Sequence, residues 1–209
     1  MPRVVCPQCE KRQARRFCPG IREDICAPCC GVERENSIEC PFGCEYLREA
    51  REREKPNEID PASIPNPDVR ITDEFVAEHQ RLIGATARLL YQAAAEVPGA
   101  IDFDIREALD AMVRTLRTLD SGLIYETRPP NPLAAGIQVR FQEGIRQLRE
   151  DVARQTGVHS IRDKDVLGVV VFWQRMELSW NNNRRRGRAF LDSLAPMSPP
   201  AALAPGLAP

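Results

Sequence analysis

The cysteines place the strongest limit on how this chain can fold. All eight lie between Cys6 and Cys44, and the rest of the 209-residue sequence has none. The first 55 residues contain few large apolar side chains, and a segment of that size buries too little surface to offset its chain entropy. Such segments generally fold around a metal ion or disulfide bonds. The cysteines therefore decide how the front of the chain becomes ordered.

The redox environment decides between those two possibilities. The start of the chain, Met-Pro-Arg-Val-Val-Cys, lacks the charged and then apolar pattern of a secretory signal, so we expect a cytoplasmic protein. Clustered cysteines in the reducing cytosol bind metal or carry out redox chemistry. In a secreted protein the eight cysteines would instead form four disulfide bridges, which stays as an alternative. The sequence has no run of about 18 apolar residues, and we expect no membrane partner.

Two C-x-x-C pairs are the clearest metal-binding signal. Cys6 pairs with Cys9, and Cys26 pairs with Cys29. A tight turn within such a pair aims both sulfur atoms at one ion. Structural zinc supplies roughly 10–16 kcal/mol of folding energy to small domains, which is enough to order this segment. We therefore predict a zinc-stabilised N-terminal module over residues 1–55.

The other four cysteines make up a second set. Cys40 and Cys44 are four residues apart and would share one face of a helix, while Cys18 and Cys30 stand alone. Adjacent Cys29 and Cys30 point in different directions, so we do not expect one ion to take both. Eight thiolates complete two tetrahedral sites, and we predict two structural Zn²⁺ ions.

We predict that the two sites interleave along the chain. The first would use Cys6, Cys9, Cys26 and Cys29. The second would use Cys18, Cys30, Cys40 and Cys44. A sequential arrangement, with Cys6, Cys9, Cys18 and Cys26 at one ion, is the alternative. Cys30 can also be a buried free thiol instead of a ligand.

The cysteine spacing resembles that of a known zinc finger. The order Cys6-x2-Cys9-x8-Cys18-x7-Cys26-x2-Cys29, with a later close pair, is similar to the B-box type. That resemblance covers residues 6–44 and implies a small cross-braced fold that holds two zinc ions and mediates protein–protein contacts. Cysteines replace the usual histidines here, Ile21 stands at the position of an acidic ligand, and Cys30 is extra. We expect a B-box-like or zinc-ribbon-like module.

The whole chain also resembles a family of bacterial zinc-finger proteins that begin with such a cysteine block. The likeness rests on Cys29-Cys30-Gly31-Val32-Glu33-Arg34-Glu35 and on Cys40-Pro41-Phe42-Gly43-Cys44-Glu45-Tyr46-Leu47. It implies no activity.

Other chemistries of clustered cysteines have less support. An iron–sulfur cluster can also take four thiolates, but the ferredoxin-type cysteine runs are absent. A thioredoxin-like role for Cys26 and Cys29 would need a strand–helix context that the surrounding residues do not suggest. Catalytic zinc keeps an open coordination position, whereas eight thiolates close two sites. No Walker loop, GxGxxG, nucleophile elbow or HExxH motif occurs, and we expect no enzyme.

Composition divides the rest of the chain into three parts. Residues 56–70 carry four prolines and are typical of an extended linker. Residues 71–194 show helical periodicity and predict an all-α bundle of four to five helices. Residues 195–209 are rich in alanine and proline, and we expect a disordered tail.

Capping residues and glycines mark the predicted helices. We expect helices from Thr72 to Pro98-Gly99, from Asp104 to Gly122, from Asn131-Pro132 to Gly157, from Ser160 onward, and from Arg188 to Leu194. The fourth is apolar most of the way round, which predicts that it is the central element. We expect neither His79, on a helix face, nor His159, in a turn, to be catalytic.

Two functions fit this organisation. The leading hypothesis is a zinc-binding adaptor that presents a surface to a protein partner. The alternative is a nucleic-acid-binding regulator, which would use Arg184, Arg185, Arg186 and Arg188 for phosphate contacts. Against the alternative, the net charge is −1, and a charged run after a helix is usually a solvated helix end.

Overall fold

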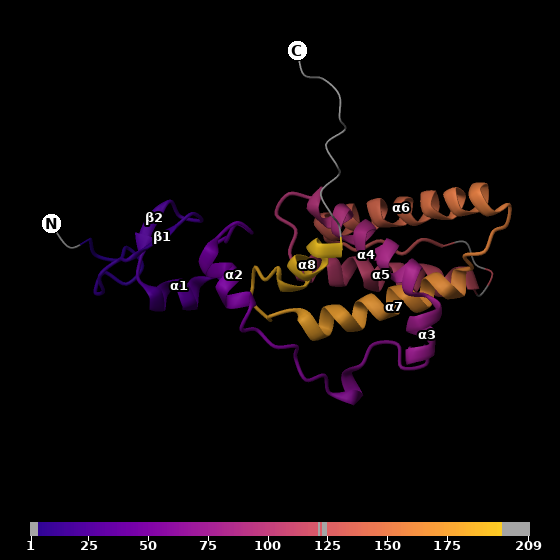
Figure 1. Cartoon of the computed structure of the whole chain (residues 1–209), viewed down its shortest axis with the longest axis horizontal. Coiled ribbons are helices and arrows are strands. Elements are labelled where there is room, and N and C mark those ends of the chain that lie inside the picture. The colour runs from indigo at the N-terminus through magenta and orange to yellow at the C-terminus, as the bar shows by residue number, and fades with distance from the viewer. Residues whose placement is uncertain (1–3, 121, 123–124, 198–209) are drawn as a thin grey trace, which may run out of the picture.

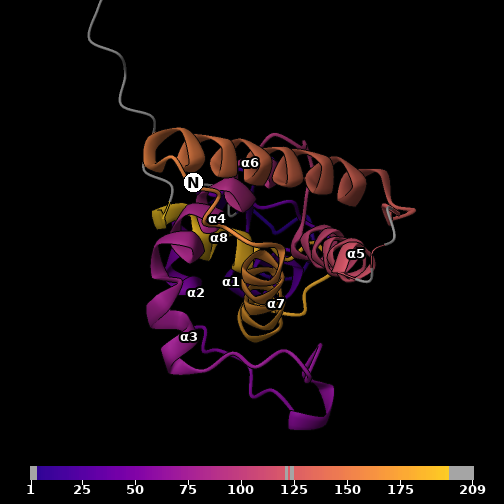
Figure 2. The ribbon, with the colours of Figure 1, turned by 90° about the vertical axis from the view of Figure 1, so that its right-hand side faces the viewer.

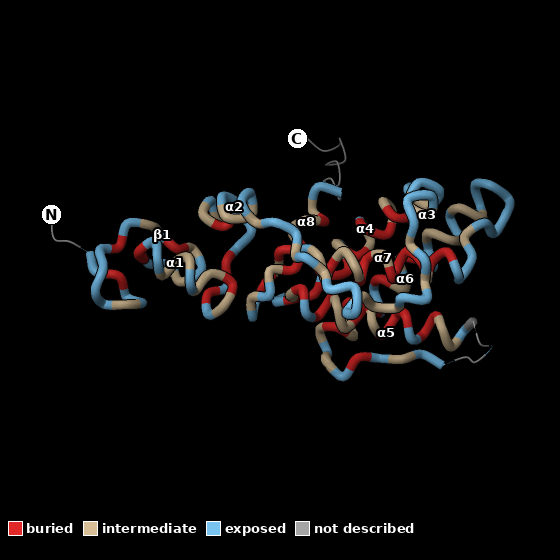
Figure 3. The backbone as a smooth tube through the Cα atoms, turned by 90° about the horizontal axis from the view of Figure 1, so that it is seen from below, coloured by how far each residue is buried: buried red, intermediate tan, exposed pale blue. Residues whose placement is uncertain are grey.

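The computed structural model describes residues 4–120, 122 and 125–197. It places the cysteine-rich segment at one end of an elongated molecule and a larger helical body at the other (Figure 1). Buried residues gather in the helical body, and the module has shorter buried stretches (Figure 3). None of the described helices is long and apolar enough to cross a membrane.

The module contains one small hairpin and two short helices. Strand β1 (Arg16–Cys18) pairs antiparallel with β2 (Glu23–Ile25), and Arg16 lies opposite Ile25. Helix α1 (Ala27–Glu33) begins with a proline in its first turn, where no backbone N–H is required. Helix α2 (Glu45–Arg51) follows Cys44.

Cysteines make up half of the buried cluster of the module. Four cysteines are buried there, Cys6, Cys18, Cys26 and Cys40. Among the described residues they share this cluster with Ile25, Ile38, Leu47 and the small Ala14. So few apolar side chains do not amount to a hydrophobic core that could stabilise the module alone.

The helical body is built from six helices within the described residues. They are α3 (Asp73–Glu78), α4 (Gln80–Ala95), α5 (Asp102–Asp120), α6 (Pro132–Thr156), α7 (Asp163–Trp180) and α8 (Ala189–Leu194). Short 3₁₀ turns, η1 (Pro61–Ser63) and η2 (Ala195–Met197), precede and follow them. Helix α5 packs against both α6 and α7, and α4 packs against α6. Figure 2 views α5 and α7 nearly end-on, with α6 running across them.

Helix α7 is the central element, as its all-round apolar pattern predicts. Val169, Val170 and Val171 are consecutive and fully buried, which requires neighbours on every side. Trp173 is buried too, and its indole nitrogen donates a hydrogen bond of 2.9 Å to the hydroxyl of Thr86 on α4. This bond satisfies both polar groups inside the core.

Several predicted helix ends are confirmed by cap geometry. The Thr72 hydroxyl accepts a hydrogen bond from the Phe75 N–H at 3.2 Å, and the Asn131 carboxamide accepts one from Leu133 at 3.0 Å. Gly157 ends α6 at φ 72°, a left-handed conformation that favours glycine.

Two boundaries differ from the sequence prediction, and the helix count is higher than four to five. The first predicted helix is divided at His79, whose backbone (φ −100°, ψ 13°) leaves the helical path between α3 and α4. The His79 ring stacks on Phe75 at 4.2 Å, so packing holds the bend. Helix α7 begins after Arg162 rather than at Ser160, because the Asp165 carboxylate accepts the Arg162 N–H at 3.1 Å.

The proline-rich segment is extended and runs along α7. Asn57 donates its backbone N–H to Ser179 at 2.7 Å. Further along, Arg175 donates to the backbone oxygens of Pro65, Asn66 and Val69. These contacts bind both ends of the segment 57–69 to the helical body. The predicted tail from 198 onward lies outside the described residues.

Candidate metal centre

The first four-cysteine set is brought together by one loop and one helix start. In the loop, the Cys6 N–H donates to Arg12 at 2.8 Å and the Glu10 N–H donates to Cys6 at 2.8 Å, which folds the chain back on itself. Glu10 adopts a positive φ of 51°, as a turn this tight requires. Cys26 lies at the N-cap of α1 and Cys29 in its first turn. Local geometry therefore positions the two cysteines of each pair: the loop positions Cys6 and Cys9, and the start of α1 positions Cys26 and Cys29.

The sulfur atoms of Cys6, Cys9, Cys26 and Cys29 all lie within 4.8 Å of one another. The Sγ atoms of Cys9 and Cys26 are 3.9 Å apart. Zinc–sulfur bonds of about 2.3 Å give a tetrahedron with edges of about 3.8 Å. The set therefore matches a single tetrahedral ion, and the residues fit zinc. The sequential alternative would put Cys18 in place of Cys29, which this grouping does not support.

The electrostatic environment of the first set favours a bound cation. Hydrogen bonds from the backbone N–H groups of Lys11 and Arg12 lower the pKa of Cys9 to about 6. The neighbouring Cys26 side chain, together with burial, raises the pKa of Cys29 to about 12. The two cysteines differ because a second thiolate beside the first is unfavourable. All four can ionise together only if a cation lies between them.

The other four cysteines line a separate small cavity. Cys18, Cys30, Cys40 and Cys44 surround a space of about 10 Å³ together with Ile25, Ile38 and Leu47. That volume is close to one water-sized sphere. Burial, followed by the charge of Glu35 and of the Cys18 and Cys44 thiols, raises the pKa of Cys40 despite a backbone hydrogen bond from Glu35. Among the described residues, this set does not reach the mutual 4.8 Å spacing of the first.

Helix α1 separates the two sets. Cys26 and Cys29 belong to the first set, and Cys30 lines the cavity of the second. Adjacent helical residues point about 100° apart, so the neighbouring side chains of Cys29 and Cys30 point toward different groups of cysteines. Cys40 and Cys44 are brought together by a turn, not by a shared helix face: the Cys44 N–H donates to Pro41 at 3.0 Å, and α2 begins only after Cys44.

The arginine run at 184–188 is only partly solvated, because three of its side chains contact the module while Arg185 and Arg186 are exposed. Arg184 donates to the backbone oxygens of Gly31 and Arg34 at 3.1 and 2.5 Å, at the C-terminus of α1. Arg186 pairs with Glu39 at 3.2 Å. Arg188 donates to the backbone oxygen of Cys40 and stacks over Phe42 at 4.3 Å. Three of the four arginines are therefore occupied in holding the module against the helical body.

Glu35 lies at the centre of this contact and is 1 % exposed. One carboxylate oxygen accepts from Arg51 at 2.5 Å and from the Arg188 N–H at 3.0 Å. The other accepts from Asn182 at 2.8 Å, and the backbone oxygen accepts from the Arg186 N–H at 2.7 Å. The sequence analysis names Glu35 only as the last residue of the block that begins at Cys29, and it assigns Glu35 no role, because its partners lie about 150 residues away in the chain.

The remaining candidates show structural roles. The His79 side chain is 13 % exposed and lies 3.6 Å from Asp165, packed on Phe75. His159 is exposed in a turn. The segment 125–131 is tied to α5 and α6: Thr127 donates to the Thr115 hydroxyl at 3.0 Å and accepts from Gln138 at 2.7 Å.

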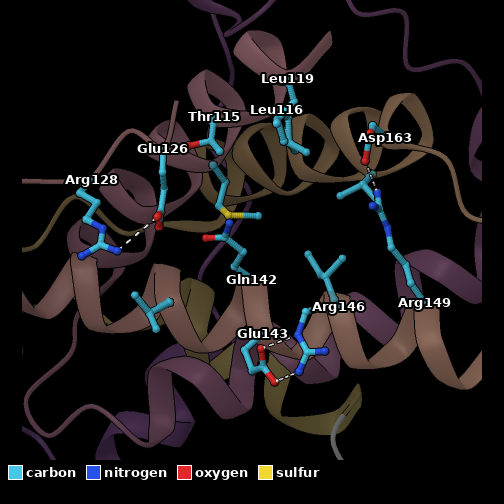
Figure 4. A pocket seen from close by; sticks show the side chains of 14 residues that line it. Thr115, Leu116, Leu119, Glu126, Arg128, Gln142, Glu143, Arg146, Arg149 and Asp163 are labelled. Atoms are coloured by element: carbon cyan, nitrogen blue, oxygen red, sulfur yellow. Dashed lines mark hydrogen bonds and ion pairs between the residues drawn. The ribbon is translucent and has the colours of Figure 1, made fainter. Parts of the chain in front are cut away.

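Several hollows lie in the helical body, away from the cysteines. One, of about 500 Å³, opens between α5, α6 and the start of α7 over an apolar floor that includes Leu116 and Ile145. Its charged residues pair with one another, Glu126 with Arg128, Glu143 with Arg146 and Asp163 with Arg149 (Figure 4). No nucleophile–base pair converges on it within the described residues.

The fold and the site define a cysteine-rich module with a candidate metal site, joined to a predominantly helical body. Comparison with known proteins finds no matching family model, no matching curated protein and no matching solved structure.

Proposed function

We propose that this protein is a zinc-binding adaptor whose metal is structural and whose folded surface engages a protein partner. The observation that carries the proposal is the mutual spacing of Cys6, Cys9, Cys26 and Cys29, all within 4.8 Å. Four thiolates leave no coordination position for water or substrate, which is typical of a structural site.

Zinc fits this set better than an iron–sulfur cluster. An all-thiolate tetrahedron suits zinc, and a single ion brings its ligands to the spacing seen here. In a cluster, each cysteine binds a different iron atom or shares an iron with one other cysteine, so the four sulfurs stand farther apart. Zinc in a closed site has no redox role, and its contribution is folding energy.

We extend the proposal to a second zinc ion at Cys18, Cys30, Cys40 and Cys44. Support comes from their shared cavity and from the position of Cys30, which turns away from the first set on α1. Two ions on interleaved ligands would give the cross-braced arrangement of a B-box-like module. Binding of the ion would draw the four sulfurs together from their present spacing.

The adaptor role and the absence of catalysis are part of the same proposal. The hollow between α5 and α6 has an apolar floor and a rim of paired charges, which suits a protein surface better than a substrate. The nucleic-acid alternative has less support, because Arg184, Arg186 and Arg188 are engaged within the chain.

Native mass spectrometry on protein purified without added metal tests the zinc proposal. We expect two zinc ions in the wild type and one in a variant that carries both Cys26→Ser and Cys29→Ser. A matched control, Ser37→Ala on an exposed turn of the module, keeps both ions. Wild-type protein with no zinc, or with an iron absorption band, would contradict the proposal.

A partner pull-down tests the adaptor role separately. We expect the same protein to be retained by the wild type and by Ser37→Ala, and lost with Cys26→Ser and Cys29→Ser. Retention of DNA or heparin by the wild type, with affinity falling steeply as salt rises, would instead support the nucleic-acid alternative.

A further inference from the structure

The second cysteine set lies directly at the contact between the module and the helical body. The backbone oxygen of Cys40 accepts a hydrogen bond from Arg188. The last carbonyl groups of α1, which also carries Cys30, accept hydrogen bonds from Arg184. Cys44 immediately precedes α2, and that helix brings Arg51 to Glu35. Each of these three cysteines is therefore a few residues from a group that holds the body.

The first set has no such connection. In the described part of the chain, no hydrogen bond or ion pair joins residues 4–30 to residues 57–197. Figure 1 shows the hairpin of β1 and β2 on the far side of the module, away from α7 and α8. The two sites therefore differ in what their metal can influence.

The loop that carries Glu35 has short-range hydrogen bonds that run back to Glu33, but no regular secondary structure and little buried apolar surface of its own. Between α1 and α2 the backbone makes turns and one isolated bridge, Arg34 with Ile38. Ile38 is its one buried large apolar side chain. Cys30 lies before the loop, and Cys40 and Cys44 lie after it. Metal bonds at those positions would fix both ends of the loop and thereby set the position of Glu35.

Glu35 makes the contact cooperative. Its carboxylate is buried and interacts with Arg51 from the module and with Asn182 and Arg188 from the body. A buried charge that loses one partner is strongly unfavourable, so these bonds form or break as a group. A loop that loosens would release Glu35 to solvent, and the 182–188 segment would lose its hydrogen bonds to Glu35.

We propose that metal at Cys18, Cys30, Cys40 and Cys44 acts as a latch that holds the module on the helical body through Glu35, and that loss of this metal frees Arg184 and Arg188 from their contacts with the module, beside the already exposed Arg185 and Arg186. The proposal rests on the second zinc ion of the proposed function. It adds a consequence: the metal content of one site controls the accessibility of a basic surface that lies about 150 residues further along the chain.

The test compares Cys40→Ser with Cys9→Ser, its counterpart in the first set, in the full chain. Native mass spectrometry counts zinc, and hydrogen exchange follows the amides of Arg186 and Arg188, which donate to Glu35. With Cys40→Ser we expect one ion fewer, exchange of both amides faster by about tenfold or more, and elution from heparin at higher salt. With Cys9→Ser we expect one ion fewer and exchange of those amides within about threefold of the wild type.

A third variant, Glu35→Gln, separates the latch from the metal. We expect it to keep both zinc ions while its 186 and 188 amides exchange faster and its heparin retention rises. If Cys40→Ser misfolds, shown by loss of amide protection in α7, graded chelation of the wild type replaces it, and release of one ion must accompany faster exchange at Arg186 and Arg188.

The outcomes distinguish the two proposals. Loss of one ion with unchanged protection of Arg186 and Arg188 overturns the latch and leaves the second zinc site standing. An unchanged zinc count in Cys40→Ser overturns the second site and the latch with it. Equal acceleration in Cys9→Ser and Cys40→Ser also overturns the latch, because the whole module would then act as one unit.

Discussion

At the scale of single residues, buried acidic side chains join parts of this molecule that are distant in sequence. Glu177 on α7 is 1 % exposed and accepts two hydrogen bonds from Arg106 on α5, at 2.8 and 3.0 Å. Asp102 is 4 % exposed and accepts the N–H groups of Phe190 and Leu191 at the start of α8. Burial of each carboxyl group is tolerated because its oxygen atoms accept hydrogen bonds from a residue of another element.

Arg106→Ala tests the first of these pairs. It leaves Glu177 buried with no cationic partner, and we expect the free energy of unfolding to fall by about 3 kcal/mol. Arg140→Ala is the matched control, because its pair with Glu96 is exposed on both sides and contributes about 0.5 kcal/mol. Urea denaturation measures both. Similar losses in the two variants would show that burial does not set the strength of the Arg106 pair.

The Asp102 carboxyl predicts a pH dependence of stability. Burial, and then the negative charges of Glu177 and Glu35, raise its pKa from 3.8 to about 7, although two backbone N–H groups act in the opposite direction. The folded protein therefore holds this proton between about pH 4 and 7, whereas the unfolded chain has released it. The contribution of this group to stability falls as pH rises through that window, and levels off above pH 7.

Denaturation of the wild type and of Asp102→Asn across pH 4–8 checks this expectation. The variant cannot ionise, so we expect it to lose the part of the slope that Asp102 contributes, up to about 1.4 kcal/mol per pH unit. It also loses one accepted N–H bond, which lowers its stability at every pH by about 1 kcal/mol. Identical slopes in the two proteins would exclude Asp102 as the source.

At the scale of elements, close approach between helices depends on glycine at one position of α7. A Cβ at Gly168 would lie 2.5 Å from the ring of Phe75 on α3. The Phe75 ring cannot move freely, because it stacks on His79 at 4.2 Å. The short helix α3 is therefore seated in a space that only the missing side chain of Gly168 provides.

Gly168→Ala is expected to destabilise the body by about 1–3 kcal/mol and to release α3 first. Gly84→Ala on α4 is the control, since no atom would lie within 4 Å of its new Cβ. There we expect a gain of about 0.5–1 kcal/mol, because alanine favours the helix. Thermal denaturation gives the sign of each change, and equal signs for the two variants would contradict the packing argument.

At the scale of the whole molecule, the two parts depend on different sources of stability. The helical body buries a continuous apolar cluster that draws on α4 to α8. The module buries four cysteines together with Ala14, Ile25, Ile38 and Leu47. Hydrophobic burial can support the first part alone, whereas the proposed structural zinc would supply roughly 10–16 kcal/mol to the second.

Metal removal is therefore expected to act selectively. After treatment with a strong zinc chelator, we expect residues 16–51 to lose hydrogen-exchange protection while α5 and α7 keep theirs. Added zinc should restore the module. Cooperative loss of both parts, or a module that keeps its protection without metal, would show that this division of stability is wrong.

The sequence by itself determined the features that depend on neighbours in the chain. The C-x-x-C turns, the caps at Thr72 and Asn131, the glycine at 157 and the all-round apolar pattern of α7 are local, since each results from residues within a turn or two of one another. The composition of the front segment also predicted that metal would replace a hydrophobic core there.

Only the tertiary structure decided the contacts between distant segments. Glu35 meets Asn182 and Arg188, the arginine run binds the end of α1, and the proline-rich segment lies along α7. The packing of Phe75 between His79 and Gly168 divided a helix that periodicity alone predicts to be continuous. These outcomes depend on which surfaces meet once the helices pack, and hydrophobic periodicity specifies the face that a helix buries without specifying its partner.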